Sequence, residues 1–194
     1  PFYNYDNVKT AVEILKDKEG LNYGPKKITV STAGIANKIP DAAKEIGTYL
    51  AISLHAPSDD IREMIMPINK KFKIKDLIKQ CKYYSSIVKE KITLEYVMLR
   101  DVNDDLKCAK QLVKLMAQFP CKVNLIEFNT WPGVQYLPTK RKDIEKFGNI
   151  IQEAGYVATI RRSRGQDILG ACGQLRTESA KNKGIFIKNN NNLT

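Results

Sequence analysis

The stretch Leu50-Ala51-Ile52-Ser53-Leu54, followed by His55-Ala56-Pro57, decides the fold. It is a short and continuous apolar run that ends at a turn, which is typical of a parallel strand buried on both faces. Helical patterns precede and follow it along the chain. The run therefore predicts an α/β protein, in which helices connect parallel strands.

The same unit repeats outward from this run in both directions. Strand-like runs, rich in β-branched residues, occupy residues 28–30, 92–99, 123–128 and 156–162. Apolar residues recur at helical spacing between them, and we expect Ser58, Asp104 and Thr139 to cap three of the helices. Strict alternation of strand and helix predicts a parallel sheet with right-handed crossovers.

The composition favours one domain and an anionic partner. At 194 residues the chain can bury one good core, and its formal net charge is +11. Such a charge favours binding to RNA or DNA, although lysines scattered over a solvated surface would give the same total. The sequence has no apolar run long enough to span a membrane and no visible signal peptide. We expect a domain over residues 1–178, followed by a polar, flexible tail over residues 179–194.

The cysteines do not form a recognisable metal or disulfide framework. The sequence has four, widely spaced and without a Cys-x2-Cys pair. Dispersed thiols fit a reducing cytoplasm, which is the expected location. Cys172 differs from the others because it lies between small residues and follows an arginine cluster at residues 161–164. It is either a reachable, activated thiol or a small buried cysteine in a packed loop.

Candidate binding residues lie where the predicted strands end. Ligands of parallel α/β sheets bind at the carboxyl ends of the strands, and Ser31, Ser53, His55 and Asn129 lie there. His55 is the single histidine of the chain, and both a catalytic and a structural role remain open. Two strand glutamates, Glu95 and Glu127, could serve as acid-base groups, but we favour solvated strand ends for both. In the loop at residues 129–136, Trp131, Pro132 and Tyr136 either stack on bases or pack on the rim of the sheet.

Six stretches, taken together and in this order, resemble a known family. They are Ile28-Thr29-Val30-Ser31-Thr32-Ala33-Gly34, Leu50-Ala51-Ile52-Ser53-Leu54-His55-Ala56-Pro57, Met66-Pro67-Ile68-Asn69-Lys70, Glu95-Tyr96-Val97-Met98-Leu99, Pro120-Cys121-Lys122-Val123-Asn124-Leu125-Ile126 and Ala171-Cys172-Gly173-Gln174-Leu175. The chain resembles, over about residues 1–180, the radical S-adenosylmethionine (SAM) RNA methyltransferases. These enzymes methylate C2 of adenine in 23S rRNA and tRNA.

The resemblance implies a fold, cofactors and site residues. The fold is a partial (βα)6 barrel of about four βα units plus one C-terminal strand. SAM contacts map onto Ser31, onto Ser53, Leu54 and His55, and onto Asn129, and Cys172 maps onto a cysteine that carries the methyl group. A [4Fe-4S] cluster, reduced by an electron donor, cleaves a second SAM molecule to make a radical. A second cysteine then resolves the adduct between protein and RNA, so a disulfide bond is expected in the full-length protein.

Several parts of the family pattern are missing from this sequence. The Cys-x3-Cys-x2-Cys cluster motif is absent, so the cluster ligands are expected outside this chain, with no metal site inside it. Pro1 matches the last residue of a Gly-Met-Gly-Glu-Pro motif, which indicates a piece of a longer polypeptide that is inactive alone. Two alternatives are a non-catalytic basic RNA-binding module and an unrelated βα-barrel enzyme that acts on phosphorylated metabolites.

Overall fold

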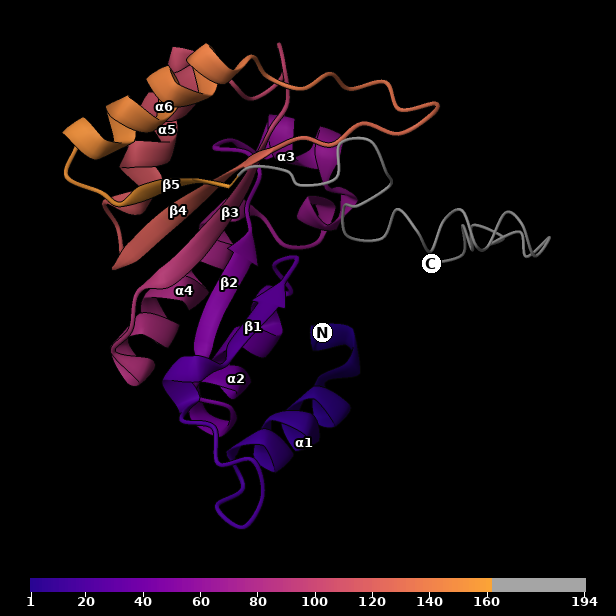
Figure 1. Cartoon of the computed structure of the whole chain (residues 1–194), viewed down its shortest axis with the longest axis vertical. Coiled ribbons are helices and arrows are strands. Elements are labelled where there is room, and N and C mark those ends of the chain that lie inside the picture. The colour runs from indigo at the N-terminus through magenta and orange to yellow at the C-terminus, as the bar shows by residue number, and fades with distance from the viewer. Residues whose placement is uncertain (162–194) are drawn as a thin grey trace.

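Five parallel strands form one sheet within residues 1–161, the part of the chain that the computed structural model describes (Figure 1). The strands lie side by side in chain order, and each neighbouring pair is parallel. They are β1 (Thr29–Thr32), β2 (Tyr49–Ser53), β3 (Ile92–Met98), β4 (Cys121–Glu127) and β5 (Ala158–Arg161). The predicted α/β class and parallel sheet are confirmed.

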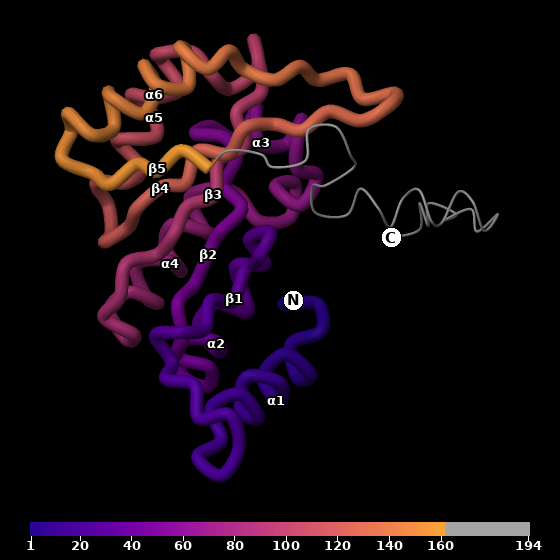
Figure 2. The backbone as a smooth tube through the Cα atoms, in the orientation of Figure 1, coloured from indigo at the N-terminus to yellow at the C-terminus, as the bar shows by residue number. Residues whose placement is uncertain are grey.

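Helices connect each strand to the next, as the alternating pattern predicts. The α-helices are α1 (Tyr5–Lys16), α2 (Ile39–Glu45), α3 (Asp59–Ile65), α4 (Ile74–Val88), α5 (Leu106–Met116) and α6 (Arg141–Glu153). Short 3-10 helices are η1 (Phe2–Asn4), η2 (Pro25–Lys27), η3 (Ala36–Lys38) and η4 (Pro67–Lys70). Since every crossover returns to the neighbouring strand in the same direction, the sheet winds continuously as a segment of a barrel (Figure 2).

The hydrophobic core lies between the sheet and the helices on one of its sides. Along β2, β3 and β4, Ile52, Leu94 and Val123 are fully buried and stand in register with one another. Leu77 of α4 and Phe147 of α6 are buried in the same core. Because side chains alternate along a strand, the residues between these positions face the opposite side of the sheet, which carries the candidate site.

Helix α1 packs against α2 at the β1 end of the sheet. The Tyr5 hydroxyl donates a hydrogen bond to the Glu45 carboxylate (3.2 Å), and Lys16 Nζ donates to the carbonyl of Ile46 (3.0 Å). Burial and the nearby carboxylates raise the pKa of Tyr5, so its hydroxyl remains protonated as the donor. These contacts attach the N-terminal helix to α2.

Two of the predicted helix caps are wrong by one residue. Asp105 caps α5 by accepting a hydrogen bond from the Cys108 amide (2.6 Å), and the residue at the N-cap of α6 is Lys140. Asp104 and Thr139, the predicted caps, bond to each other instead (2.8 Å). Their pairing fastens the start of α6 to the loop after β3, which a reading of local sequence does not detect.

The third predicted cap is correct in position and wrong in mechanism. Ser58 precedes α3, but its side chain makes no capping hydrogen bond, and its carbonyl accepts from the amide of Arg62 (3.0 Å). None of the helices within residues 1–161 combines the length and apolar character needed to cross a bilayer. The predicted boundary at residues 178/179 lies outside the described residues.

Candidate functional site

The face of the sheet opposite the helices carries a row of polar side chains. Ser53 of β2 is in register with Glu95 of β3, which is in register with Asn124 of β4 and then Thr159 of β5. Neighbours in register share one face of a sheet. Four consecutive strands therefore present hydroxyl, carboxylate and amide groups at one level of the sheet. On β2 this level is the carboxyl end, where ligands of such sheets bind.

Ser31 and Ser53 lie on this polar face, as the sequence predicts for ligand-binding residues. Ser31 pairs with Ala51, two residues before Ser53, so the two serines point to the same side of the sheet. Ser31 is exposed and Ser53 is half-buried. Both hydroxyls are positioned to contact a polar ligand lying across β1 and β2.

Leu54 cannot offer its side chain to the same ligand. That side chain is 0% exposed and belongs to the apolar core. The Leu54 amide donates to the carbonyl of Glu95 (3.1 Å), and its own carbonyl accepts from Arg62 Nε (3.1 Å). Any contribution of Leu54 to binding must therefore come through its backbone.

His55 has a structural role at the end of β2. Its Nδ1 accepts a hydrogen bond from the amide of Val97 (3.2 Å), which belongs to β3. This bond links His55 to β3 just after β2 has ended. Its backbone is left-handed (φ 56°), which turns the chain out of the sheet. Burial, and then the nearby charge of Arg62, lower the pKa of His55 to about 4. The ring is therefore neutral near pH 7, and because Nδ1 is an acceptor, the proton resides on Nε2.

Asn129 follows β4 and begins a loop that folds back toward β3. Asn129 is buried, and the loop is anchored where Arg100 donates from its amide to Leu137 (2.9 Å) and from Nε to Pro138 (3.0 Å). Trp131 packs edge-on against Phe128 and is 41% exposed. Packing on the rim of the sheet therefore covers part of the Trp131 indole, and the rest of the ring faces solvent.

Glu95 and Glu127 differ in their polar partners, although the sequence predicts a solvated strand end for both. Glu95 Oε1 accepts from Asn124 Nδ2 (3.1 Å), while Glu95 Oε2 is buried without a hydrogen-bond partner. The prediction of a solvated carboxylate is therefore wrong for Glu95. Glu127 is half-buried and pairs with Arg141 of α6 (2.8 Å).

A fully buried arginine holds the carboxyl ends of β1 and β2 together. Arg62 Nη2 donates to the carbonyls of Ala33 (2.8 Å) and Ser53 (3.1 Å), while Nε donates to Leu54. Burial lowers the pKa of Arg62 to about 10, so the guanidinium is still charged at neutral pH. One cation therefore fixes the backbone shortly after Ser31 and the backbone at Ser53 and Leu54.

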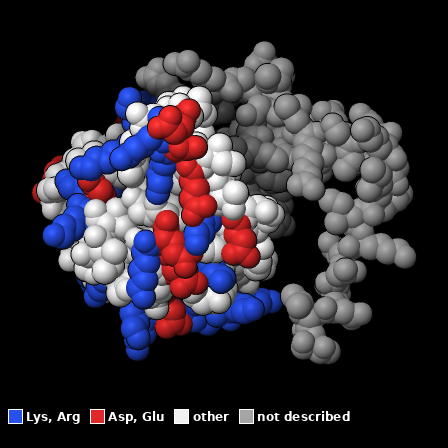
Figure 3. Space-filling model, turned by 90° about the horizontal axis from the view of Figure 1, so that it is seen from below, with Lys and Arg blue, Asp and Glu red and all other residues white. Residues whose placement is uncertain are grey.

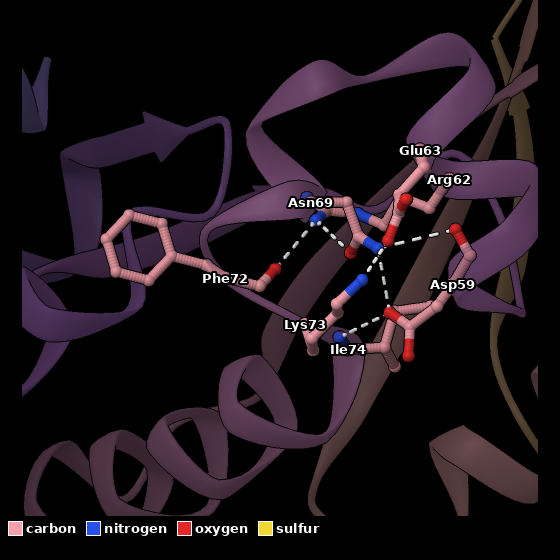
Figure 4. Close-up of polar contacts among 7 residues, drawn as sticks. All are labelled: Asp59, Arg62, Glu63, Asn69, Phe72, Lys73 and Ile74. Carbon is pink, nitrogen blue, oxygen red and sulfur yellow. Dashed lines mark hydrogen bonds and ion pairs between the residues drawn. The ribbon is translucent and has the colours of Figure 1, made fainter. Parts of the chain in front are cut away.

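Further contacts fix the position of Arg62 itself, as Figure 4 shows. Its Nη1 donates to Asn69 Oδ1 (2.9 Å), and Asn69 Nδ2 donates to the carboxylate of Asp59 (2.8 Å). The same carboxylate accepts from the amide of Ile74 at the start of α4 (2.9 Å). Lys73 and Glu63 form an ion pair at the outer side of this cluster. The cluster joins α3, η4 and α4 into one support for the site.

Asn103 makes the equivalent connection between β2 and β3. Its Nδ2 donates to the carbonyls of His55 and Val97 (both 2.7 Å), and its Oδ1 accepts from the amide of Leu99 (2.8 Å). Asn103 is fully buried, and its side chain makes hydrogen bonds to backbone groups of both segments. Its position fixes the turn that carries His55.

The described cysteines are inert packing residues. Cys81, Cys108 and Cys121 are free and buried, and burial raises the pKa of Cys108 and of Cys121 to about 12. Within residues 1–161 there is no group of three His, Cys, Asp or Glu side chains that could hold a metal ion. The predicted carrier, Cys172, lies outside the described residues, as does most of the arginine cluster before it.

Charges of both signs mix over the lower surface of the molecule. In Figure 3, lysine and arginine side chains alternate with aspartate and glutamate side chains. Lysines and glutamates also pair directly within residues 1–161, as in Lys9–Glu45 (3.1 Å) and Lys26–Glu90 (2.6 Å). The net charge of +11 therefore does not produce a uniformly basic surface on this side.

Comparison with known proteins identifies relatives of this chain. It is 50% identical over 186 residues to the dual-specificity RNA methyltransferase RlmN of Rhizobium meliloti strain 1021, which covers 95% of this chain and 45% of the relative. The chain is homologous to part of an RlmN protein. The RlmN of Agrobacterium fabrum strain C58 is also 50% identical, over 182 residues, covering 93% of this chain and 44% of the relative. This chain thus spans less than half the length of these RlmN proteins, and no family model matches it.

Solved structures support the RlmN relationship at the level of the fold. A radical SAM methyltransferase from Sphaerobacter thermophilus superposes with a TM-score of 0.85 at 40% identity, covering 90% of this chain and 51% of that one. A domain of pyruvate-formate lyase-activating enzyme from Bacteroides vulgatus has a TM-score of 0.56 at 15% identity and shares the fold alone. The chain therefore shares the fold of these two proteins, and the fold agrees with the one that the family resemblance implies.

Proposed function

We propose that this chain is the C-terminal part of a radical SAM enzyme that methylates C2 of adenine in 23S rRNA and tRNA. The observation that carries the proposal is the 50% identity to RlmN proteins over 95% of the chain. The placement of Ser31, Ser53 and His55 on or beside one polar sheet face supports it, because these are the positions that the family resemblance assigns to SAM. Cytoplasmic location and a domain over residues 1–178 belong to the same proposal.

The residues of this face fit SAM as a ligand. Ser31 and Ser53 offer hydroxyls, neutral His55 offers an Nε2 proton as donor, and Leu54 offers only backbone groups. Asn129, at the end of β4, completes the proposed set. When bound, SAM supplies the methyl group, and this chain's own residues orient it through these contacts. Arg62 and Asn103 act as positioning residues because they fix the backbone that carries these contacts.

The described residues do not fit a [4Fe-4S] cluster. The three cysteines of residues 1–161 are buried at separate places, and no candidate group of metal ligands exists there. Because the full sequence also lacks the Cys-x3-Cys-x2-Cys motif, we propose that polypeptide outside this chain supplies the cluster ligands. The chain alone is accordingly inactive in this proposal, and the complete enzyme needs an external electron donor.

Cys172 is the proposed methyl carrier, and its replacement is the direct test. We expect Cys172→Ala in the full-length protein to abolish methylation of 23S rRNA and tRNA without loss of folded structure by circular dichroism. Mass spectrometry of the wild-type protein from its native context should find one added methyl group on Cys172. Cys108→Ala is the matched control, because its thiol is buried in the core, and it should retain methylation. Retained activity in Cys172→Ala, or methyl on another cysteine, contradicts the carrier role.

A non-catalytic RNA-binding module is the second candidate, favoured by the net charge of +11. It predicts binding to rRNA fragments that weakens steeply with salt and does not change in Cys172→Ala. A chain without affinity for RNA at low salt would eliminate this candidate. Methyl on Cys172 would favour the enzyme instead.

A further inference from the structure

Glu95 occupies the centre of the polar face and has one oxygen without a partner. It lies on β3, in register with Ser53 on one side and Asn124 on the other. Its Oε1 accepts from Asn124 Nδ2 at 3.1 Å, whereas its Oε2 is buried and makes no hydrogen bond. Among the described residues only Ser85 Oγ shares this condition. Buried acceptors are rarely left unpaired, so Oε2 marks a place where a donor is missing.

The neighbours of Glu95 cannot turn to satisfy Oε2. The Thr159 hydroxyl bonds to Asn124 Oδ1, which directs the amide nitrogen of Asn124 toward Glu95. The carboxylate is thus held through Oε1, and its second oxygen remains fixed in the site. A buried acceptor without a partner raises the free energy of the unbound protein. A ligand that donates a hydrogen bond to it removes this cost and therefore binds more tightly.

The chemistry of a carboxylate limits what that partner is. An ionised carboxylate only accepts hydrogen bonds, and no ion pair of Glu95 exists within residues 1–161. An RNA phosphate has no proton to donate and would be repelled. Hydroxyl groups are suitable, and in dinucleotide-binding sheets an acidic residue binds the ribose hydroxyls of the ligand. The part of the ligand over β3 is therefore a hydrogen-bond donor, such as a hydroxyl group, rather than an anion.

We propose that Glu95 binds the ribose of SAM, with Oε2 accepting a hydrogen bond from a ribose hydroxyl. This assignment rests on the proposed function, because it places SAM across β2 and β3 next to Ser53. Glu95 then adds a binding residue to the five positions that the family resemblance assigns. The pair Asn124 and Thr159 positions the carboxylate and does not itself touch the cofactor.

The test compares ligands as well as variants. Binding of SAM, 2′-deoxy-SAM and 3′-deoxy-SAM to the full-length protein is measured by isothermal titration calorimetry for wild type and Glu95→Gln. Glu95→Gln keeps an oxygen for Asn124 and removes the charge, so SAM affinity should fall about 10- to 100-fold, as for a hydrogen bond to a charged group. At least one deoxy analogue should bind wild type and Glu95→Gln equally, because that analogue lacks the ribose hydroxyl that donates to residue 95. Glu127→Gln, at a strand end paired with Arg141, is the matched control and should bind SAM as wild type does.

Each outcome of this experiment decides something. If wild type binds SAM and Glu95→Gln binds it equally well, the role of Glu95 is refuted and the proposed function stands. Equal loss for SAM and for both deoxy analogues also refutes it, because the effect then bypasses the hydroxyls. If wild type binds no SAM, the SAM site proposed for this chain fails together with the inference. Thermal unfolding without ligand distinguishes a role in ligand binding from a merely structural one. We expect Glu95→Gln to melt at or above the wild-type temperature. A lower melting temperature would contradict the ligand role.

Discussion

A Cβ atom on Gly34 would lie 2.8 Å from Nη2 of Arg62, so this glycine leaves room for the buried guanidinium. Gly34 also has a φ of 99°, in the region that side chains disfavour. We predict that Gly34→Ala lowers the free energy of unfolding by about 3 kcal/mol, from backbone strain and overpacking together. Urea denaturation measures the change.

Two other glycines separate these causes. Gly47 has a φ of 63°, and a Cβ added there would meet nothing within 4 Å, so Gly47→Ala should cost only about 1 kcal/mol. Gly24 has a φ of -61° and equally open surroundings, so Gly24→Ala should be nearly neutral. If Gly34→Ala costs no more than Gly47→Ala, close contact with Arg62 is not what selects glycine at position 34.

Replacing Arg62 itself should be more damaging than replacing any surface cation. Arg62→Met fills similar volume but leaves the carbonyls of Ala33, Ser53 and Leu54 without their donor. We expect a loss of about 3–5 kcal/mol in the free energy of unfolding, as for breaking other buried charged networks. The control is Arg141→Met, which removes exposed ion pairs on α6 and should cost less than about 1 kcal/mol. Equal costs for the two variants would show that the Arg62 contacts contribute little.

The sequence predicts the sheet well because its signals are local. The apolar run before His55 and the helical spacing through α4 each determine an element without reference to distant residues. The errors lie where a tertiary contact replaces a local one. Asp104 matches the pattern of a helix cap, yet it pairs with Thr139, 35 residues away, and leaves the cap to Asp105.

The sequence predicts where candidate site residues lie but not what supports them. Ser31 and Ser53 are predicted because ligands bind at strand ends and the residue types suit that task, and the structure places both on one face of the sheet, while their role in binding stays a prediction. The sequence does not reveal Arg62, because an arginine in a short charged helix is expected at the surface. Its whole side chain is buried because carbonyls at the ends of two strands accept its hydrogen bonds. Gly34, shortly after β1, is the one local sign of a close approach there.

His55 should make stability depend on pH below neutrality. Its pKa is about 4 in the folded chain and near 6.5 when unfolded. Between these values the unfolded state binds a proton that the folded state does not, so stability is fully present above about pH 6.5 and is lost as pH falls toward 4. Denaturant titrations across this range should give a decline that is absent from His55→Asn.

The variant His55→Asn is informative because it preserves the structural contact. Asparagine tolerates a left-handed backbone, and its Oδ1 can accept from the Val97 amide where Nδ1 does now. It should cost less than about 1 kcal/mol at pH 7, whereas His55→Ala should cost about 2–3 kcal/mol by leaving that amide unpaired. A pH-dependent decline that persists in His55→Asn would assign the effect to another group.

Asp105 should stabilise the start of α5, although Asp104 has the same side chain one residue earlier. Hydrogen bonding from the Cys108 amide lowers the pKa of Asp105, so its contribution is present above its unfolded pKa and is lost as acid protonates the folded carboxylate. We predict that Asp105→Ala costs about 1 kcal/mol and that Asp105→Ser, another capping residue, recovers most of it. Hydrogen exchange at the Cys108 amide provides the local readout, since exchange should accelerate in Asp105→Ala and stay unchanged in Asp104→Ala. Faster exchange in Asp104→Ala alone would return the cap to the residue that the sequence pattern favours.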